Sequence, residues 1–192
     1  MKAPTLKTVN LTLSAPVVYK GMDMSHYLRW LSDLTVTRYS EQRHLKHSKD
    51  TQFKFMSGFM ESPDYYWDIN LNVNDDPIGS LTATCDWNNM VANVGILIGD
   101  LRYWGRGFAC ESYEAVIEFL FGEGFRKIEV GTMAANGQMI HVLHKLGFVQ
   151  EAVIKDHYLL NGQPQDLYCY AKFRKAKVVA FKDPRKESTD PV

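Results

Sequence analysis

A glycine loop set between a strand pattern and a helix pattern constrains the fold of this chain most. The loop lies in "LRYWGRGFACESY", residues 101–113. It follows the alternating stretch "VANVGILIG" (91–99) and leads into the amphipathic stretch "CESYEAVIEFLFGEG" (110–124). A further strand pattern, "RKIEVGTMA" (126–134), comes next. Strand, loop, helix and strand in this order predict a crossover that can hold two parallel strands.

The patterns on either side of the crossover predict one sheet flanked by helices. Strands are expected at residues 10–15, 65–73 and 78–87 and in a final hairpin over 149–173, and helices at 23–34 (capped by Asp23 or Ser25), 50–62 and 136–148. The predicted fold class is α/β (α+β), with a single mixed, mostly antiparallel sheet of about six to seven strands. Residues 1–174 are expected to form one domain, and the charged, proline-bearing residues 175–192 a mobile tail.

Composition gives little reason to expect a polyanionic or membrane partner. The chain of 192 residues has 22 Lys plus Arg and 22 Asp plus Glu, so we expect neither nucleic acid nor a membrane surface as a partner. Its cysteines, Cys85, Cys110 and Cys169, are far apart and lack metal-ligand spacing, so no metal site or disulfide is predicted. No apolar run is long enough for a signal peptide or a membrane span, which favours a cytoplasmic location.

The glycine loop has the properties of an anion site. Backbone N–H groups of residues 102–109 converge at a helix N-terminus, whose partial positive charge favours a phosphate group. Gly105 and Gly107 permit positive φ and a close approach of the backbone, while Arg102 and Arg106 add charge. The spacing fits neither a Walker loop nor a dinucleotide fingerprint. A plain glycine turn before a helix remains the alternative for this motif alone.

Three further segments carry a family resemblance. Together with the R-x-x-G-x-G motif of the loop, these segments resemble GCN5-related N-acetyltransferases (GNAT) of the RimJ/RimL-like branch. The segments are "NGQMIHVLHKLGFVQEA" (136–152), the strands "IGSLTATCDWNNMVANVGILIGD" (78–100) and the ending "VIKDHYLLNGQPQDLYCYAKF" (153–173). The resemblance spans residues 78–173, about half the chain. It implies that the two central strands splay apart and that acetyl-CoA lies between them as co-substrate, without a metal.

The resemblance also implies a set of cofactor-binding residues. Backbone groups of Leu97 and Ile98 would hold the pantetheine arm, together with Asn136, and Lys145 would lie near the outer part of the cofactor. The diphosphate would lie on the loop formed by Arg102, Tyr103, Trp104, Gly105, Arg106, Gly107, Phe108 and Ala109.

The implied reaction is direct acetyl transfer to a primary amine in a ternary complex. It requires a deprotonated amine, a stabilised thioester oxyanion and a proton for the leaving thiolate. Backbone N–H groups near Leu97, over Ile96 to Ile98, would serve the oxyanion. The positions where the family often has a glutamate, a serine and a tyrosine hold Asn93, Met139 and Leu143 here, so acid and base stay unassigned. A non-catalytic acetyl-CoA-binding module is therefore an alternative.

Four other side chains are candidates for the acid and base: His157, Asp86, His141 and Tyr158. Histidine is the side chain most often used as a general base, and His157 lies in the hairpin expected to border the acceptor, although an exposed hairpin histidine is the alternative. Asp86 is the second candidate, with a turn-stabilising role as its alternative. Cys110 lies at a helix N-terminus, which can lower a thiol pKa, and a packed cysteine is the alternative there.

The acceptor is expected to be a small-molecule or peptide amine bound by a monomer or homodimer. Its pocket would be formed by the first two helices, the segment joining them and the last hairpin. The basic run "RYSEQRHLKH" (38–47) in that segment is loosely similar to acetyltransferases acting on nucleotide-linked amino sugars. This favours an amino-sugar nucleotide, with a protein N-terminus or a small amine as alternatives.

Overall fold

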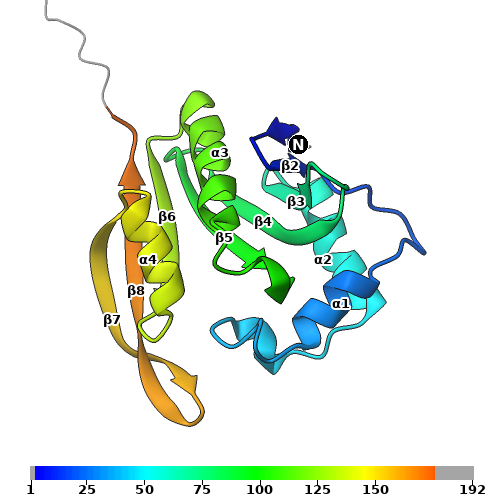
Figure 1. The fold of residues 1–192 in the computed structure, drawn as a ribbon. Helices are drawn as coiled ribbons and strands as arrows, with labels where there is room; N and C mark the ends of the chain where they lie inside the picture. Colours follow the sequence, from blue (N-terminus) through cyan, green and yellow to red (C-terminus); the bar gives the residue numbers. More distant parts are fainter. Residues whose placement is uncertain (1–2, 176–192) are drawn as a thin grey trace, which may run out of the picture.

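One eight-stranded sheet organises the chain. The computed structural model describes residues 3–175, and its strand order is β1-β2-β3-β4-β5-β6-β8-β7 (Figure 1). The strands are β1 (Leu6–Lys7), β2 (Leu11–Ser14), β3 (Tyr65–Leu71), β4 (Pro77–Asp86), β5 (Val91–Ile98), β6 (Lys127–Met133), β7 (Val149–Leu160) and β8 (Gln163–Phe173). The helices are α1 (Ser25–Ser32), α2 (Lys49–Glu61), α3 (Phe108–Gly122) and α4 (Gly137–Lys145), with 3₁₀ turns η1 (Glu41–His44) and η2 (Leu101–Tyr103).

The topology confirms the predicted meander and crossover. Strands β2 to β5 pair antiparallel in chain order, and α3 carries the chain to β6, which runs parallel to β5. The final hairpin joins the sheet through β8, so β7 is left at the edge. The sheet has one strand more than the upper expectation, because the two-residue β1 pairs with β2 and is too short to show a sequence period.

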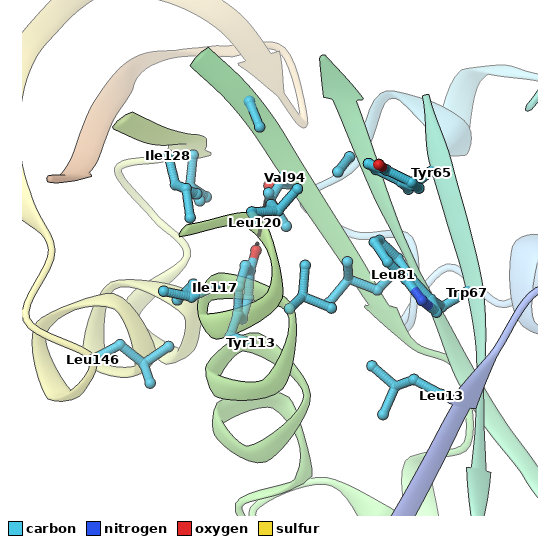
Figure 2. Packing of buried hydrophobic residues seen from close by; sticks show 14 of the residues in the cluster. Leu13, Tyr65, Trp67, Leu81, Val94, Tyr113, Ile117, Leu120, Ile128 and Leu146 are labelled. Carbon is cyan, nitrogen blue, oxygen red and sulfur yellow. Dashed lines mark hydrogen bonds between the residues drawn. The ribbon is translucent and has the colours of Figure 1, made fainter. Parts of the chain in front are cut away.

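Two hydrophobic clusters cover the two faces of the sheet. Alternation along β3 directs Tyr65 and Trp67 to the face covered by α3 and α4, and Tyr66 to the face covered by α1 and α2. Figure 2 shows residues of the first cluster, with Tyr113 of α3 directed at the sheet. The second cluster contains Met56 of α2, as the methionine-rich pattern predicted.

Local capping sets the helix starts. The N-cap of α1 is Met24, which makes no side-chain cap hydrogen bond, so the expectation that Asp23 or Ser25 caps this helix was wrong. Asp23 instead accepts hydrogen bonds from the N–H and the hydroxyl of Ser25, one on each carboxylate oxygen. Helix α3 begins at Phe108, two residues earlier than expected, directly after Gly107 in a left-handed conformation. Except for Lys175, the expected tail lies outside the described residues. No helix within residues 3–175 is long and apolar enough to cross a membrane.

The two central strands separate as expected. Parallel pairing between β5 and β6 is limited to Val91 with Lys127, Ala92 with Ile128 and Asn93 with Glu129. Beyond this point β5 stays paired with β4, and β6 stays paired with β8. A gap therefore opens between the two strands directly after Asn93 and Glu129.

Candidate functional site

The hydrogen-bond phase of β5 decides which backbone groups face this gap. The N–H of Gly99 donates to the carbonyl of Ile78, while Ile98 is the register partner of Gly79. In an antiparallel ladder this makes Leu97 and Ser80 a hydrogen-bonded pair. The backbone groups of Leu97 are therefore used within the sheet, and those of Ile96 and Ile98 point into the gap. Within the expected range of Ile96 to Ile98, the two outer residues are therefore the ones whose backbone groups face the gap.

Two side chains donate hydrogen bonds to carbonyl groups of β5 that face the gap. The hydroxyl of Tyr113 donates to the carbonyl of Val94 at 3.5 Å, the contact drawn dashed in Figure 2. The indole Nε1 of Trp104 donates to the carbonyl of Ile98 at 2.7 Å. Among the described residues nothing bonds the N–H or the carbonyl of Ile96 across the gap. Ile96 is therefore the residue of β5 best placed to bond an extended ligand there.

The glycine loop presents a row of unused donors. Gly105 has φ 72° and Gly107 has φ 87°, and Gly107 is the N-cap residue of α3, where no side chain caps the helix. Within the part of the chain that the structure describes, no acceptor bonds the backbone N–H groups of residues 105–110. A Cβ at either glycine would meet no protein atom within 4 Å, so positive φ is the reason for glycine here. The arrangement fits a diphosphate.

The two arginines of the loop differ in availability. The guanidinium of Arg102 folds back onto Asp100, with Nη2 to Oδ2 at 2.6 Å and Nε to Oδ1 at 3.0 Å. This contact holds the pKa of the Asp100 carboxyl below its usual value. Arg106 lies over the ring of Tyr103 at 5.5 Å and forms no ion pair within residues 3–175. Arg106 is therefore the free cation at the loop.

Asn136 and Lys145 lie at the two ends of α4. The side-chain oxygen of Asn136 accepts from the N–H of Met139 at 3.2 Å, so part of its role is to cap the helix. Lys145 is exposed, and its charge acts on Cys110 in the first turn of α3, which places it near the loop. Burial nevertheless raises the pKa of the Cys110 thiol above its usual value, so this cysteine is a packed one.

The candidate bases from the sequence lie in different places. Asp86 ends β4, and its carboxylate accepts from the N–H and the side-chain amide of Asn89, at 2.9 Å and 2.7 Å. These bonds lower its pKa and fit the turn-stabilising alternative. His157 is exposed on β7 with its ring against Tyr158. His141 is exposed on α4.

The structure also places Asn93, Met139 and Leu143, the residues at the positions where the resembled family often has a glutamate, a serine and a tyrosine. Leu143 is fully buried in the core and Met139 is half-buried against it, so neither exchanges protons. Asn93 alternates with the buried Ala92 and Val94, so it is directed away from α3, to the opposite face of the sheet. That face contains a cavity of about 600 Å³ next to Asn93, with Thr84, Asp86, Lys127 and Glu129 in its walls.

Two carboxylates on this face were missed by the sequence interpretation. Glu129 is the register partner of Asn93, and only strand pairing reveals that relation. Asp68 of β3 accepts a hydrogen bond from the hydroxyl of Tyr27 in α1, and burial raises its pKa to about 6. The alternation in "YYWDINL" directs Asp68 to the same face as Tyr66, and this was the signal available for it.

The structure brings the joining segment and the hairpin together. Nη2 of Arg43 in η1 donates to the carbonyl of Leu159 in β7 at 2.9 Å. Arg43 also pairs with Glu41 at 3.0 Å, so this arginine serves the contact between the two segments. Arg38, His44 and Lys46 are the exposed basic residues of the run. In residues 3–175 no group of three His, Cys, Asp or Glu side chains is placed to hold a metal ion.

The sequence matches a model of a known protein family over most of its length. Residues 11–149 match the model described as an acetyltransferase (GNAT) domain. The chain belongs to the GNAT acetyltransferase family. The match includes the strand gap, the glycine loop and α4, so the family resemblance read from the sequence is confirmed.

Known relatives and solved structures agree with the family assignment. "Uncharacterized N-acetyltransferase p20" of Bacillus licheniformis is 27% identical over 113 residues, which is 56% of this chain and 61% of that protein's length. The microcin C7 self-immunity acetyltransferase MccE, in complex with acetyl-CoA and AMP, has a TM-score of 0.74 at 16% identity, over 87% of this chain and 94% of that one. RimL, a ribosomal-protein acetyltransferase in complex with coenzyme A, has a TM-score of 0.74 at 18% identity, over 88% of this chain and 98% of that one. At these identities the structures show a shared fold.

Proposed function

We propose that this GNAT protein is an acetyl-CoA-dependent N-acetyltransferase that transfers acetyl directly to a primary amine in a ternary complex. The row of unpaired N–H groups over residues 105–110, next to the gap that opens after Asn93, carries this proposal. A helix N-terminus with unused donors suits a diphosphate, and an open strand edge suits an extended amide-bearing arm. The family membership and the relatives' ligands support the same co-substrate.

The residues around the gap divide the binding work. The loop N–H groups and Arg106 would hold the diphosphate, and Lys145 the outer phosphate. The backbone of Ile96 would bond the arm, with the free side-chain amide of Asn136 on the other side of the gap. The N–H of Ile96 or Ile98 would stabilise charge on the thioester oxygen, because a fixed donor in a sheltered site serves developing charge well.

The acceptor would approach from the opposite face of the sheet. The cavity beside Asn93 lies there, and the contact of Arg43 with Leu159 joins two of the expected walls. The exposed basic residues Arg38, His44 and Lys46 favour an acceptor with a phosphate group. An amino-sugar nucleotide has both a phosphate and an amine. MccE, bound to AMP, supports a nucleotide in this fold, whereas RimL supports a protein N-terminus.

Release of free coenzyme A tests the reaction. Purified protein with acetyl-CoA would be tested against a panel of amino-sugar nucleotides, N-terminal peptides and polyamines, and the thiol product quantified. We expect amine-dependent release with one class of acceptor and none without an amine. A protein that binds acetyl-CoA but releases no thiol with any acceptor would be the non-catalytic binding module instead. A protein that does not bind acetyl-CoA would contradict both functions.

A further inference from the structure

The proposed transfer needs a group that takes a proton from the acceptor ammonium. On strands β3 to β6, three carboxylates belong to the sheet face opposite α3 and α4: Asp68, Asp86 and Glu129. Carboxylates can serve as general bases when they lie within direct or one-water reach of the amine. Their positions relative to the gap decide between them.

Glu129 lies at the opening of the gap. It pairs with Asn93 in the last register position before β5 and β6 separate. Paired residues of neighbouring strands project to the same face, so both side chains are directed to the face opposite α3. Both also lie in the wall of the 600 Å³ cavity, which gives an acceptor access to them. The Glu129 side chain is 40% exposed, as a proton acceptor for a bound amine must be.

The other two carboxylates are used elsewhere. Asp86 is held by Asn89 in the β4–β5 turn. Asp68 is in register with Ser80, which is in register with Leu97, so Asp68 is two strands from β5, about 10 Å at normal strand spacing. It also lies beneath α1, bonded to Tyr27. Neither lies at the gap.

A lysine orients the Glu129 carboxylate. Nζ of Lys127 contacts Oε1 of Glu129 and Oε2 of Glu151, each at 2.7 Å. The hydrogen bonds to Glu129 and Glu151 raise the pKa of Lys127 above its usual value. Among the described residues nothing bonds the second oxygen, Oε2, of Glu129, so this oxygen is available. The other charged groups in the cavity wall are Arg126 and Asp86.

We propose that Glu129 is the catalytic base for the acetyl transfer proposed above. Its carboxylate takes one proton from the acceptor ammonium, directly or through one water, and the freed nitrogen lone pair forms the C–N bond to the acetyl carbonyl carbon. The C–S bond breaks with its electron pair on sulfur. The second nitrogen proton ends on that sulfur, and Glu129 returns the first proton to solvent, so one proton is released per amide formed.

Three variants test this role with the amine that gives the fastest coenzyme A release. Glu129→Gln keeps the shape and removes the basic oxygen, and we expect kcat/KM to fall about 100-fold or more. Glu151→Gln removes the second carboxylate that contacts Lys127, and Glu151 is not part of the cavity wall. We expect kcat/KM to change less than about threefold in this variant. Asn93→Glu combined with Glu129→Gln returns a carboxylate to the paired position, and we expect recovery to within about tenfold of wild type.

Binding separates a failed base from a failed fold or function. Every variant should show the same thermal shift with acetyl-CoA as wild type. Wild-type turnover together with an unimpaired Glu129→Gln variant would overturn the role of Glu129 and leave the proposed function intact. Equal losses in Glu129→Gln and Glu151→Gln would also overturn it, because the common factor would be Lys127. A wild type that releases no coenzyme A with any amine would contradict both proposals.

Discussion

The hydroxyl of Tyr113 donates a hydrogen bond to the carbonyl of Val94 at 3.5 Å, in the gap between the two central strands. Val94 is the first residue of β5 after its pairing with β6 ends. Helix α3 therefore supplies a donor where a neighbouring strand would supply one in a closed sheet. Complete burial of Tyr113 raises its pKa, so it stays a neutral donor at physiological pH. The gap therefore begins inside the packed core, at Val94.

Removing this hydroxyl should weaken the fold at the gap. Tyr113→Phe leaves the buried carbonyl of Val94 without its donor, and we expect a loss of about 1 kcal/mol in the free energy of unfolding. Urea denaturation measures it. Tyr158→Phe, in the exposed hairpin, is the control and should change stability by less than about 0.5 kcal/mol. Equal stability of Tyr113→Phe and wild type would show that the contact carries no weight.

The glycine loop should respond to a side chain through its backbone. Gly107→Ala forces an alanine into φ 87°, and we expect a loss of about 1–2 kcal/mol by urea denaturation. Gly122→Ala is the matched control in the same helix, because it has no positive φ and a Cβ there meets nothing within 4 Å. It should stabilise the protein by about 0.5–1 kcal/mol. If both variants were stabilised alike, backbone strain would not explain Gly107.

The two loop arginines should contribute unequally to cofactor binding. Arg106→Ala removes a free guanidinium, and we expect acetyl-CoA to bind about tenfold more weakly, because charge-assisted hydrogen bonds are among the strong ones. Arg102→Ala removes a side chain already paired with Asp100, and the change should stay below about threefold. Calorimetric titration at low and high salt measures both, and a larger effect at Arg102 would contradict the assignment.

Asp68 should make stability depend on pH. Burial raises its pKa to about 6, above the unfolded value of about 4, so the folded state binds more protons between these limits. Stability from this group is therefore present below pH 4 and is lost as pH rises to about 6. Asp68→Asn removes this loss of stability at higher pH, because asparagine does not ionise, and its side-chain oxygen can still accept the hydrogen bond from Tyr27. We expect it to stabilise the protein by up to about 3 kcal/mol at pH 7.5 and far less at pH 4.5.

Unfolding in urea at the two pH values measures this effect. Tyr27→Phe is the control, because it removes the hydrogen bond that the Tyr27 hydroxyl donates to Asp68 and should lower stability at pH 7.5. The account of Asp68 fails if wild type and Asp68→Asn differ equally at both pH values.

Local patterns in the sequence were enough to predict the crossover, the meander and the glycine loop between a strand and a helix. The spacing of Arg102, Gly105 and Gly107 before an amphipathic stretch lies within a few residues of chain. The sequence did not predict which arginine is free to bind a ligand, because Arg102 pairs with Asp100 only in the folded loop. Glu129 meets Asn93 through pairing between strands 36 positions apart, which no local period encodes. The assignment of Ile96 over Leu97 likewise needed the phase of the ladder.

Calorimetric titration with acetyl-CoA tests the central claim most directly, comparing wild type with Gly107→Glu and with Gly122→Glu as the matched control. Gly107→Glu places a carboxylate where the loop N–H groups would receive the diphosphate, and Gly122→Glu makes the same change at the far end of α3. We predict one acetyl-CoA bound per chain in wild type and in Gly122→Glu, with affinity reduced about 100-fold or more in Gly107→Glu. Absence of binding in wild type, or equal affinity in all three proteins, would contradict it.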